Sequence, residues 1–333
     1  MTPFPNSPSR HNIYGRNMKR YLTSLFIVCA LTFGLSSAAL AEQEAQPENT
    51  QTQPKKKRAK MLTGTPVHTA IAGGGSLPKG VALTVYNFSL ADKTQSKRGY
   101  KGSDVYNQTH LIKLRYGITN HWEITSTGGY VNNGFRDPKH AGKRPGNIEG
   151  PIDQLLGFTY APLQLHQGDP VAVSVSAGIY IPTGVYGKNH LPAAGAWGSR
   201  LCTGFATFLN DDIRFDTEFS WATTFERGNQ NVRKGDQYQW NTMVRYLFDW
   251  FDIGLESVYT HYEDNVGYRN GKSNRGNLKN GGADWYIGPN TSIAIDALDM
   301  WVGAGVYFPV MQDMNGPAAT DDVQFHFKVA KMW

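Results

Sequence analysis

The chain has 333 residues, of which 40% are hydrophobic and 18% are charged, and its formal net charge at pH 7 is +6. Both fractions are below the roughly 45–50% and 25% of ordinary soluble domains, while 36 glycines and 12% aromatic residues exclude a collagen, a coiled coil and a disordered tail. The excess positive charge lies before residue 61, so the remaining chain is not expected to bind nucleic acid.

The first 41 residues are predicted to be a secretory signal peptide that is cleaved after Ala41. A basic segment, Met18–Arg20, precedes an apolar run from Leu22 to Leu35, and the small residues that a signal peptidase requires follow it. The run has about 14 residues, fewer than the roughly 20 that a membrane-spanning helix needs, so it does not indicate a membrane anchor. Residues 1–17 are either part of the signal or an upstream extension, with Met18 as the true start. We therefore expect the mature chain to be exported.

Two segments lie between the signal and the first predicted strand. Residues 42–60 are rich in Gln, Glu, Pro, Thr and Lys and are predicted to be a disordered periplasmic leader. The basic run Lys55–Lys60 is expected to aid solubility, with contact to anionic lipid or the cell wall as the alternative. Residues 61–80 are less polar and contain Gly73–Gly75, which allows tight turns. They are either a plug inside the predicted barrel or a flexible linker.

From residue 81 to residue 333, apolar residues alternate with polar or charged ones, which is the period of a β-strand with two different faces. Phe215 and Phe219, for example, oppose Asp216 and Glu218. The alternating stretches run ten to thirteen residues. They are longer than the about five or six residues of a globular strand and match the roughly 9 to 11 that cross a bilayer at a tilt.

The connections between these stretches alternate between short and long. Short polar turns are predicted at 118–120, 162–169, 210–212, 249–251 and 296–299, and long links near 92–104, 133–150, 182–198, 226–235, 263–283 and 311–320. An outer-membrane barrel has short turns on its periplasmic side and long loops outside. We therefore predict an all-β fold, a transmembrane antiparallel up-and-down β-barrel of twelve strands over residues 81–333, located in the outer membrane. A soluble β-sandwich would have shorter strands, and its connection lengths would not alternate.

The alternation turns a set of charged side chains toward the barrel interior, where they are expected to line the lumen. The set is Lys113, Arg115, Glu123, Arg214, Asp216, Glu218, Arg245, Glu256 and Lys328. An Arg or Lys that faced lipid at the bilayer midplane would cost about 2–4 kcal/mol, which supports the inward orientation. The set is either a selectivity lining for a small-molecule solute or a salt-bridged network that only stabilises the barrel.

The sequence does not predict a catalytic, cofactor or metal site. Ser257 and His261 share one strand face but are about 13 Å apart at the rise of a strand, too far for a nucleophile and its base. Gly73–Gly75 follows no predicted strand and opens no helix, so a phosphate-binding loop is not indicated. The nine histidines show no pair at metal-ligand spacing. A lipid hydrolase of the outer membrane stays an alternative, as does a structural or adhesive barrel with functional loops.

The last predicted strand carries an expected assembly signal, formed by Phe325, Phe327 and the final Trp333. An aromatic last residue on an amphipathic strand resembles the signal that the barrel-assembly machinery reads. Lys331 departs from this pattern, but a lysine at the rim can extend its charge to the lipid head groups. We therefore expect the assembly machinery and outer-membrane lipid to be partners of the chain.

Several segments resemble the outer-membrane transporter family named for the meta-pathway of phenol degradation. They are residues 116–123 (YGITNHWE), 150–157 (GPIDQLLG), 181–184 (IPTG), 288–289 (GP) and the closing aromatic strand, spread over residues 81–333. Each is a strand edge or a turn rather than a catalytic motif. The resemblance implies a porin-like barrel that carries small hydrophobic or aromatic compounds, and we expect a channel or transporter rather than an enzyme.

Overall fold

The computed structural model describes residues 75–93, 95–96, 105–135, 148–184, 194–228, 231–269, 272–277, 281–315, 319–320 and 322–333. The predicted signal peptide (1–41), the leader (42–60) and residues 61–74 of the plug or linker lie outside the described residues. Within the described ranges, no helix is both long enough and apolar enough to cross a membrane.

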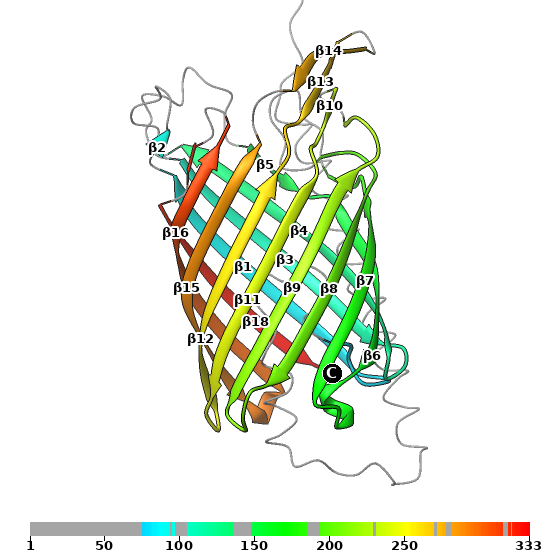
Figure 1. Cartoon of the computed structure of the whole chain (residues 1–333), viewed down its shortest axis with the longest axis vertical. Helices are drawn as coiled ribbons and strands as arrows, with labels where there is room; N and C mark the ends of the chain where they lie inside the picture. The colour runs from blue at the N-terminus through cyan, green and yellow to red at the C-terminus, as the bar shows by residue number, and fades with distance from the viewer. Residues whose placement is uncertain are drawn as a thin grey trace, which may run out of the picture. The chain divides into compact units, whose positions relative to one another are not determined.

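Twelve long strands close into an antiparallel β-barrel (Figure 1). They are β1 (Ala82–Lys93), β3 (Val105–Gly117), β4 (Trp122–Phe135), β6 (Gln154–Leu163), β7 (Val171–Ile181), β8 (Gly198–Phe208), β9 (Ile213–Thr224), β11 (Gln237–Leu247), β12 (Phe251–Tyr262), β15 (Gly282–Ile295), β16 (Met300–Met314) and β18 (Val323–Met332). The last strand pairs with the first, from Leu83↔Met332 to Asp92↔Val323, and this pairing closes the barrel. A short strand, β5 (Ile148–Pro151), also pairs with β4, beyond the residues of β4 that pair with β6. The predicted twelve-stranded barrel is confirmed.

The two ends of the barrel differ in their connections, as the sequence predicts. At one end, short turns join β3 to β4, β6 to β7, β8 to β9, β11 to β12 and β15 to β16, and two of these turns contain the short helices η1 (Leu165–Gln167) and η2 (Asp296–Leu298). The C-terminus lies at the same end, at the bottom of Figure 1. We name this the turn end, and the opposite end the loop end. In outer-membrane barrels the short turns face the periplasm.

The loop end carries short strands that the sequence did not predict (Figure 1). One pair consists of β2 (Gln95–Ser96) and β17 (Ala319–Thr320). A three-stranded sheet consists of β10 (Val232–Arg233), β13 (Val266–Arg269) and β14 (Lys272–Asn277). These strands belong to the long links between barrel strands, where the apolar alternation of the wall is absent.

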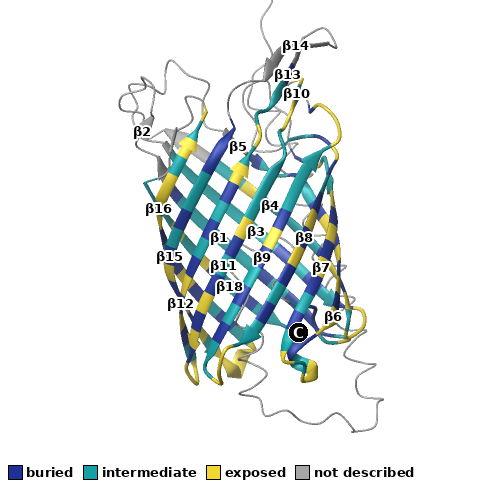
Figure 2. Cartoon of the chain, in the orientation of Figure 1, coloured by how far each residue is buried: buried dark blue, intermediate teal, exposed yellow. Residues whose placement is uncertain are grey.

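Residues along each barrel strand alternate between an outer and an inner face (Figure 2). In β7, the side chains of Val175 and Ile179 are 55% and 51% exposed, whereas Ser174 and Ser176 are buried. An outer face that exposes large apolar side chains all around the barrel is suited to lipid rather than to water. The period of two therefore decides which residues contact the membrane and which fill the interior.

Aromatic rings gather at the turn end of the outer wall. Trp122 and Tyr160 come from neighbouring strands, and their ring centroids are 4.7 Å apart. Trp250 packs on Phe251 at the β11–β12 turn, with centroids 4.6 Å apart. Amphipathic rings at this level fit the aromatic girdle of a membrane–water interface.

Candidate functional site

The candidate site is the inner wall of the barrel, which carries all nine of the charged side chains predicted to face inward. Each of them is at most 9% exposed. They come from β3 (Lys113, Arg115), β4 (Glu123), β9 (Arg214, Asp216, Glu218), β11 (Arg245), β12 (Glu256) and β18 (Lys328). Their chain neighbours point outward: Trp122 and Ile124, on either side of Glu123, are 47% and 40% exposed.

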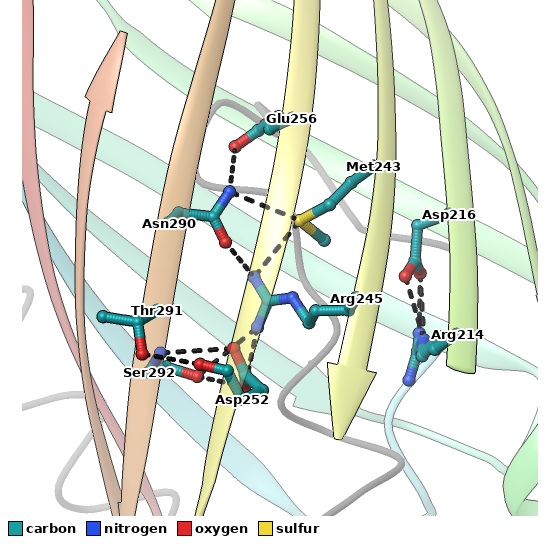
Figure 3. A network of polar contacts seen from close by, with 9 residues as sticks. All are labelled: Arg214, Asp216, Met243, Arg245, Asp252, Glu256, Asn290, Thr291 and Ser292. Atoms are coloured by element: carbon teal, nitrogen blue, oxygen red, sulfur yellow. Dashed lines mark hydrogen bonds and ion pairs between the residues drawn. The ribbon is translucent and has the colours of Figure 1, made fainter. Parts of the chain in front are cut away.

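Arg245 is the centre of one polar cluster on this wall (Figure 3). Its Nη1 atom lies 3.0 Å from Oδ2 of Asp252 and 3.4 Å from Oγ of Ser292. Its Nη2 atom donates to Oδ1 of Asn290 at 3.3 Å and lies 3.2 Å from Sδ of Met243. Ser292 in turn donates through its hydroxyl and its backbone N–H to Asp252. One guanidinium group therefore ties together three neighbouring strands, β11, β12 and β15.

Glu256 lies next to this cluster, and its two carboxylate oxygens have different surroundings. Oε2 accepts a hydrogen bond from the hydroxyl of Tyr307 and lies 3.5 Å from Nδ2 of Asn290. Oε1 is buried and has no hydrogen-bond partner among the described residues. Asn241 is 1% exposed, and its buried Oδ1 atom also has no hydrogen-bond partner among the described residues.

Two further arginines make local contacts on the wall formed by β8 and β9. Arg214 chelates Asp216, with Nε at 3.1 Å and 3.0 Å from the two carboxylate oxygens and Nη2 at 2.8 Å from one of them. Arg200 donates from Nη2 to Oγ of Ser220 at 2.7 Å and to Oε1 of Gln239 at 3.0 Å. The positive charge of Arg214 is therefore held by a carboxylate of its own strand, and that of Arg200 by neutral acceptors on β9 and β11.

Arg115 and Glu123 form a buried pair at the turn end. Nε and Nη2 of Arg115 lie 2.6 Å and 2.8 Å from the two carboxylate oxygens of Glu123, a bidentate geometry that is among the strongest ion pairs in proteins. The pair also binds the backbone of the segment before β1. Oε2 of Glu123 accepts from the N–H of Leu77 at 2.8 Å, and Nη2 of Arg115 donates to the carbonyl of Gly75 at 3.0 Å.

The segment Gly75–Gly80 is held inside the turn end of the barrel by further contacts. Ser76 donates to the carbonyl of Asn120 at 3.0 Å and accepts from Nε2 of Gln164 at 2.5 Å. A Cβ atom at position 75 would lie 2.8 Å from Oε1 of Gln164, so a glycine permits this approach. Gly80, with φ +79°, then turns the chain into β1.

Leu77 makes an apolar contact at the turn end. Its side chain is 1% exposed and belongs to a buried cluster with Val81, Leu83, Val85, Trp301 and Ala330. Leu83 and Val85 pair with the inward Arg115 and Lys113, so these two residues of the first strand also face inward. Whether residues 61–74 also occupy the lumen stays a prediction, because they lie outside the described residues.

The loop end of the inner wall has a different character from the turn end. Four of its inward residues, Ser89, Thr109, Gln239 and His326, are polar and half-buried, and the buried Arg200 binds one of them, Gln239. Most of the buried charges lie nearer the turn end, where Arg115, Glu123 and Asp252 are each within two residues of a strand terminus. The inner wall therefore carries more of its buried charge toward the turn end than toward the loop end.

Several residues of the wall were missed by the sequence interpretation. They are Arg200, Asp252, Asn290, Ser292, Tyr307 and Gln164. The available signal was parity, because Asp252 lies four residues before Glu256 on the same strand and therefore shares its inner face. Gln164 carries no such signal, since it lies in a turn between β6 and β7.

The residues that suggested a hydrolase are not arranged for catalysis. Oγ of Ser257 accepts from Nε1 of Trp285 at 2.8 Å, and Ser257 lies on the opposite face of β12 from Glu256. His261 is four residues along the same strand, with its ring 6.1 Å from that of Tyr238. Among the described residues, no three His, Cys, Asp or Glu side chains gather as a metal site.

Comparison with known proteins gives one family and a set of related barrels. The family described as "Putative MetA-pathway of phenol degradation" matches residues 74–310. The COG4313 outer membrane channel from Pseudomonas putida F1 is 13% identical, with a TM-score of 0.61 over 78% of this chain and 97% of that chain. The KdgM porin is 10% identical, with a TM-score of 0.41 over 75% of this chain and 98% of that chain. The CymD monoaromatic hydrocarbon channel is 10% identical, with a TM-score of 0.40 over 77% of this chain and 89% of that chain.

The COG4313 channel has the same fold as this chain, and the match covers 97% of the COG4313 channel. The sequence has no match among curated proteins.

Proposed function

The chain belongs to the family described as "Putative MetA-pathway of phenol degradation", and from that premise we propose that it is an outer-membrane channel for small, uncharged aromatic solutes. The barrel crosses the outer membrane with an apolar outer face and a polar inner wall. A polar interior enclosed by lipid-facing strands is the architecture of a passive pathway for solutes. The family description supports aromatic compounds as the solute class.

The observation that carries the proposal is the pairing of charges within the inner wall. Arg115, Arg214 and Arg245 each bind a carboxylate of their own or the neighbouring strand at 3.0 Å or less. A charge neutralised in this way attracts neither anions nor cations strongly. The wall is therefore better suited to a neutral solute than to an ion.

The inward charges of the wall have two roles in this proposal. The three arginine–carboxylate pairs stabilise the wall, because a buried charge is tolerated only with a partner. The uncharged half-buried residues of the loop end receive the solute first. The solute then meets the charged residues nearer the turn end, which form the selective barrier. The charged residues therefore both line the pathway and stabilise the wall.

The segment Gly75–Gly80 is the periplasmic closure in this proposal. Its backbone is bound by Arg115 and Glu123, and Leu77 fills the apolar cluster at the turn end. A solute that leaves toward the periplasm must displace or pass this segment. We further propose that residues 1–41 are a cleaved signal peptide and that residues 42–60 extend into the periplasm, where they connect to the closing segment.

The channel is proposed to act without catalysis. Ser257 faces outward from β12, and its hydroxyl accepts the indole N–H of Trp285. Among the described residues, the contact given for the Ser257 hydroxyl is with an indole N–H and not with a base, and the side chain faces away from the lumen. The barrel-assembly machinery is the proposed partner during insertion, with Phe325, Phe327 and Trp333 as the signal it reads.

The test is current recording on the purified mature protein in planar lipid bilayers. We expect discrete openings with little preference between anions and cations, and a reduction of the current when phenol is added at the loop end. The control is Ser257→Ala, which changes only the lipid-facing side. Correctly assembled protein whose current phenol, anisole and toluene all leave unchanged would contradict the proposed solute class.

A further inference from the structure

The short turns at the turn end of the barrel carry negative charge. Four of them, those that join β6 to β7, β8 to β9, β11 to β12 and β15 to β16, contain aspartates and neither Lys nor Arg. Several of these turn residues are exposed (Figure 2). We name the aspartates of the four turns the acidic rim, which consists of Asp169, Asp211, Asp212, Asp249, Asp296 and Asp299.

The geometry of the turns does not require this charge. In the β8–β9 turn, the neutral side chain of Asn210 accepts from the backbone N–H groups of Asp212 and Ile213 at 2.9 Å and 2.8 Å. Neutral Asn, Ser and Thr residues therefore form turns as well as Asp does. Carboxylates of one sign on neighbouring turns repel one another and together attract a cationic partner.

Two lysines of the described turn end offset only part of this charge. The ammonium group of Lys331 donates to the carbonyl of Leu298 and lies 5.1 Å from the centroid of the Trp333 ring. Lys79 lies just before β1, a strand that pairs with β18 and β3 and with none of the strands flanking the β8–β9 and β11–β12 turns. The acidic rim therefore keeps an excess of negative charge.

The segment Gly75–Gly80 brings the preceding chain to this rim. From the start of β1 it runs to the β6–β7 turn, where Ser76 accepts from Nε2 of Gln164 at 2.5 Å. A Cβ atom at position 75 would lie 3.7 Å from Cβ of Ala172, the second residue of β7. The chain before Gly75 therefore starts beside the first turn of the acidic rim.

The basic run Lys55–Lys60 is within reach of the rim, although it lies outside the described residues. It has five Lys or Arg residues and no acid, and its last residue is 15 positions before Gly75. A flexible chain of this length spans roughly 20 Å on average, and about 50 Å when extended. Adjacent strands are about 4.8 Å apart, so the β8–β9 and β11–β12 turns are about 10 Å and 20 Å along the rim from the β6–β7 turn.

A buried donor at the turn end lacks an acceptor among the described residues. It is Nε1 of Trp301, a residue that is 7% exposed, belongs to the cluster of Leu77 and follows the rim residue Asp299 by two positions. An indole N–H only donates, so it fits a peptide carbonyl and not a cation. No group of three or more His, Cys, Asp or Glu side chains in the described ranges is arranged to hold a metal ion. These features favour a basic peptide as the occupant of the turn end.

We propose that the basic run Lys55–Lys60 binds the acidic rim of its own barrel, so that the leader is held against the turn end as a strap. An exposed ion pair changes an equilibrium by at most about fivefold, so several pairs act together and salt weakens them. The strap rests on the proposed closure, because it keeps Gly75–Gly80 at the turn end, but it does not depend on the class of solute.

The test measures how fast trypsin cleaves within the basic run of the full mature protein in phosphatidylcholine nanodiscs, with mass spectrometry of the released peptides. A synthetic peptide of residues 42–74 gives the rate for an unbound run. At about 0.1 M NaCl we expect the run to be cleaved about tenfold more slowly in the protein, which corresponds to about 1.4 kcal/mol. At about 1 M NaCl the Debye length falls to about 3 Å, and the two rates should agree within about twofold.

The decisive variant removes one charge from each of three turns and keeps the size of the side chains. It combines Asp211→Asn, Asp249→Asn and Asp296→Asn. Cleavage in this variant should rise to within about twofold of the peptide rate. The matched control removes the same number of acids at the loop end and should be cleaved like the wild type. It combines Glu226→Gln, Glu263→Gln and Asp264→Asn.

A second measurement needs no variant. A water-soluble carbodiimide joins an amine and a carboxylate that are in contact, and we expect amide links within one wild-type chain between the basic run and the acidic rim. Cleavage as fast as in the peptide, or links only to loop-end acids, would overturn the strap.

Slow cleavage that persists in the assembled rim variant would also overturn the strap. Protection that appears only when phosphatidylglycerol is added to the nanodiscs would assign the basic run to lipid instead and overturn it as well. Heat-modifiable migration on electrophoresis establishes that each variant is assembled. The current recordings with phenol test the solute class separately, so either proposal can fail while the other stands.

Discussion

Replacing Leu77 with alanine should open the turn end of the barrel. The Leu77 side chain is 1% exposed and packs in the cluster formed with Leu83, Val85 and Trp301. Truncating a leucine in a packed core costs about 2–5 kcal/mol, and an exposed barrel mouth can relax, so the lower part of this range, about 2–3 kcal/mol, applies here. The variant keeps the backbone hydrogen bonds to Glu123 and Arg115. The lost free energy therefore comes from the apolar contacts that hold the segment in the barrel.

A loss of about 2–3 kcal/mol shifts the ratio of docked to undocked segment by about 30- to 150-fold. The measurement is the open probability of single channels in planar bilayers, which should rise steeply in Leu77→Ala at unchanged lipid composition and voltage. The control is Leu156→Ala, because Leu156 is 40% exposed on the outer wall and has no contact with the segment. Its open probability should equal that of the wild type.

The proposed closure also predicts how the Leu77→Ala substitution changes the stability of the barrel. Undocking removes Leu77 from the lumen but leaves every barrel strand paired, so the melting temperature of the barrel should fall by no more than a few degrees. An open probability that changes less than twofold in an assembled Leu77→Ala barrel would refute the reasoning. The segment Gly75–Gly80 would then be an anchor for the first strand and not a closure.

Three other predictions follow from the geometry of the barrel. The mature protein should migrate at different positions on electrophoresis with and without heating, and should resist protease except in its loops, because a closed barrel has no free strand edge; migration as a lipid-free soluble monomer would contradict the architecture. Removing Trp333 should lower the amount of assembled protein several-fold, since its backbone exchanges hydrogen bonds with Ala82 and its indole donates to Thr84; normal surface levels of the truncated chain would contradict its role in closure. Asp252→Ala should destabilise the barrel by about 3–5 kcal/mol, because it leaves the buried Arg245 without its carboxylate; a melting temperature equal to that of Glu263→Ala at the loop end would argue against a stabilising pair.

The barrel and the facing of its walls could be predicted from sequence because both depend on a local pattern. A strand that separates lipid from a polar interior must alternate at every second residue, and β9 shows this with Phe215 and Phe219 outside and Asp216 and Glu218 inside. The lengths of turns and loops are also visible in the chain. The two together determine strand number, direction and membrane orientation without any knowledge of tertiary contacts.

The partners of the inward residues could not be predicted in the same way, because they depend on register and on contacts between distant segments. Leu77 binds Glu123 across 46 residues, and Gln164 binds Ser76 across 88. The unpaired acceptors on Glu256 and Asn241 are a property of how the wall packs and have no counterpart in composition or period. The short strands β10, β13 and β14 were missed because loop sheets lack a lipid face and therefore lack the alternation.

The charged pairs of the wall are local in sequence, and this explains how a barrel interior can contain so many charges. Arg214 and Asp216 are two residues apart on one strand, and Arg115 with Glu123 and Arg245 with Asp252 span single hairpins of eight and seven residues. Each pair is contained in one strand or one hairpin, so it does not depend on the pairing of the first strand with the last. A charge that is neutralised by its own hairpin does not have to be buried alone at any stage, so its desolvation is compensated early. The contact of Trp333 with Thr84 across 249 residues, which needs the closed barrel, is instead made by an indole and a hydroxyl group. The three arginine–carboxylate pairs are thus local in sequence, whereas the contact between the two ends of the barrel sheet is made by neutral groups.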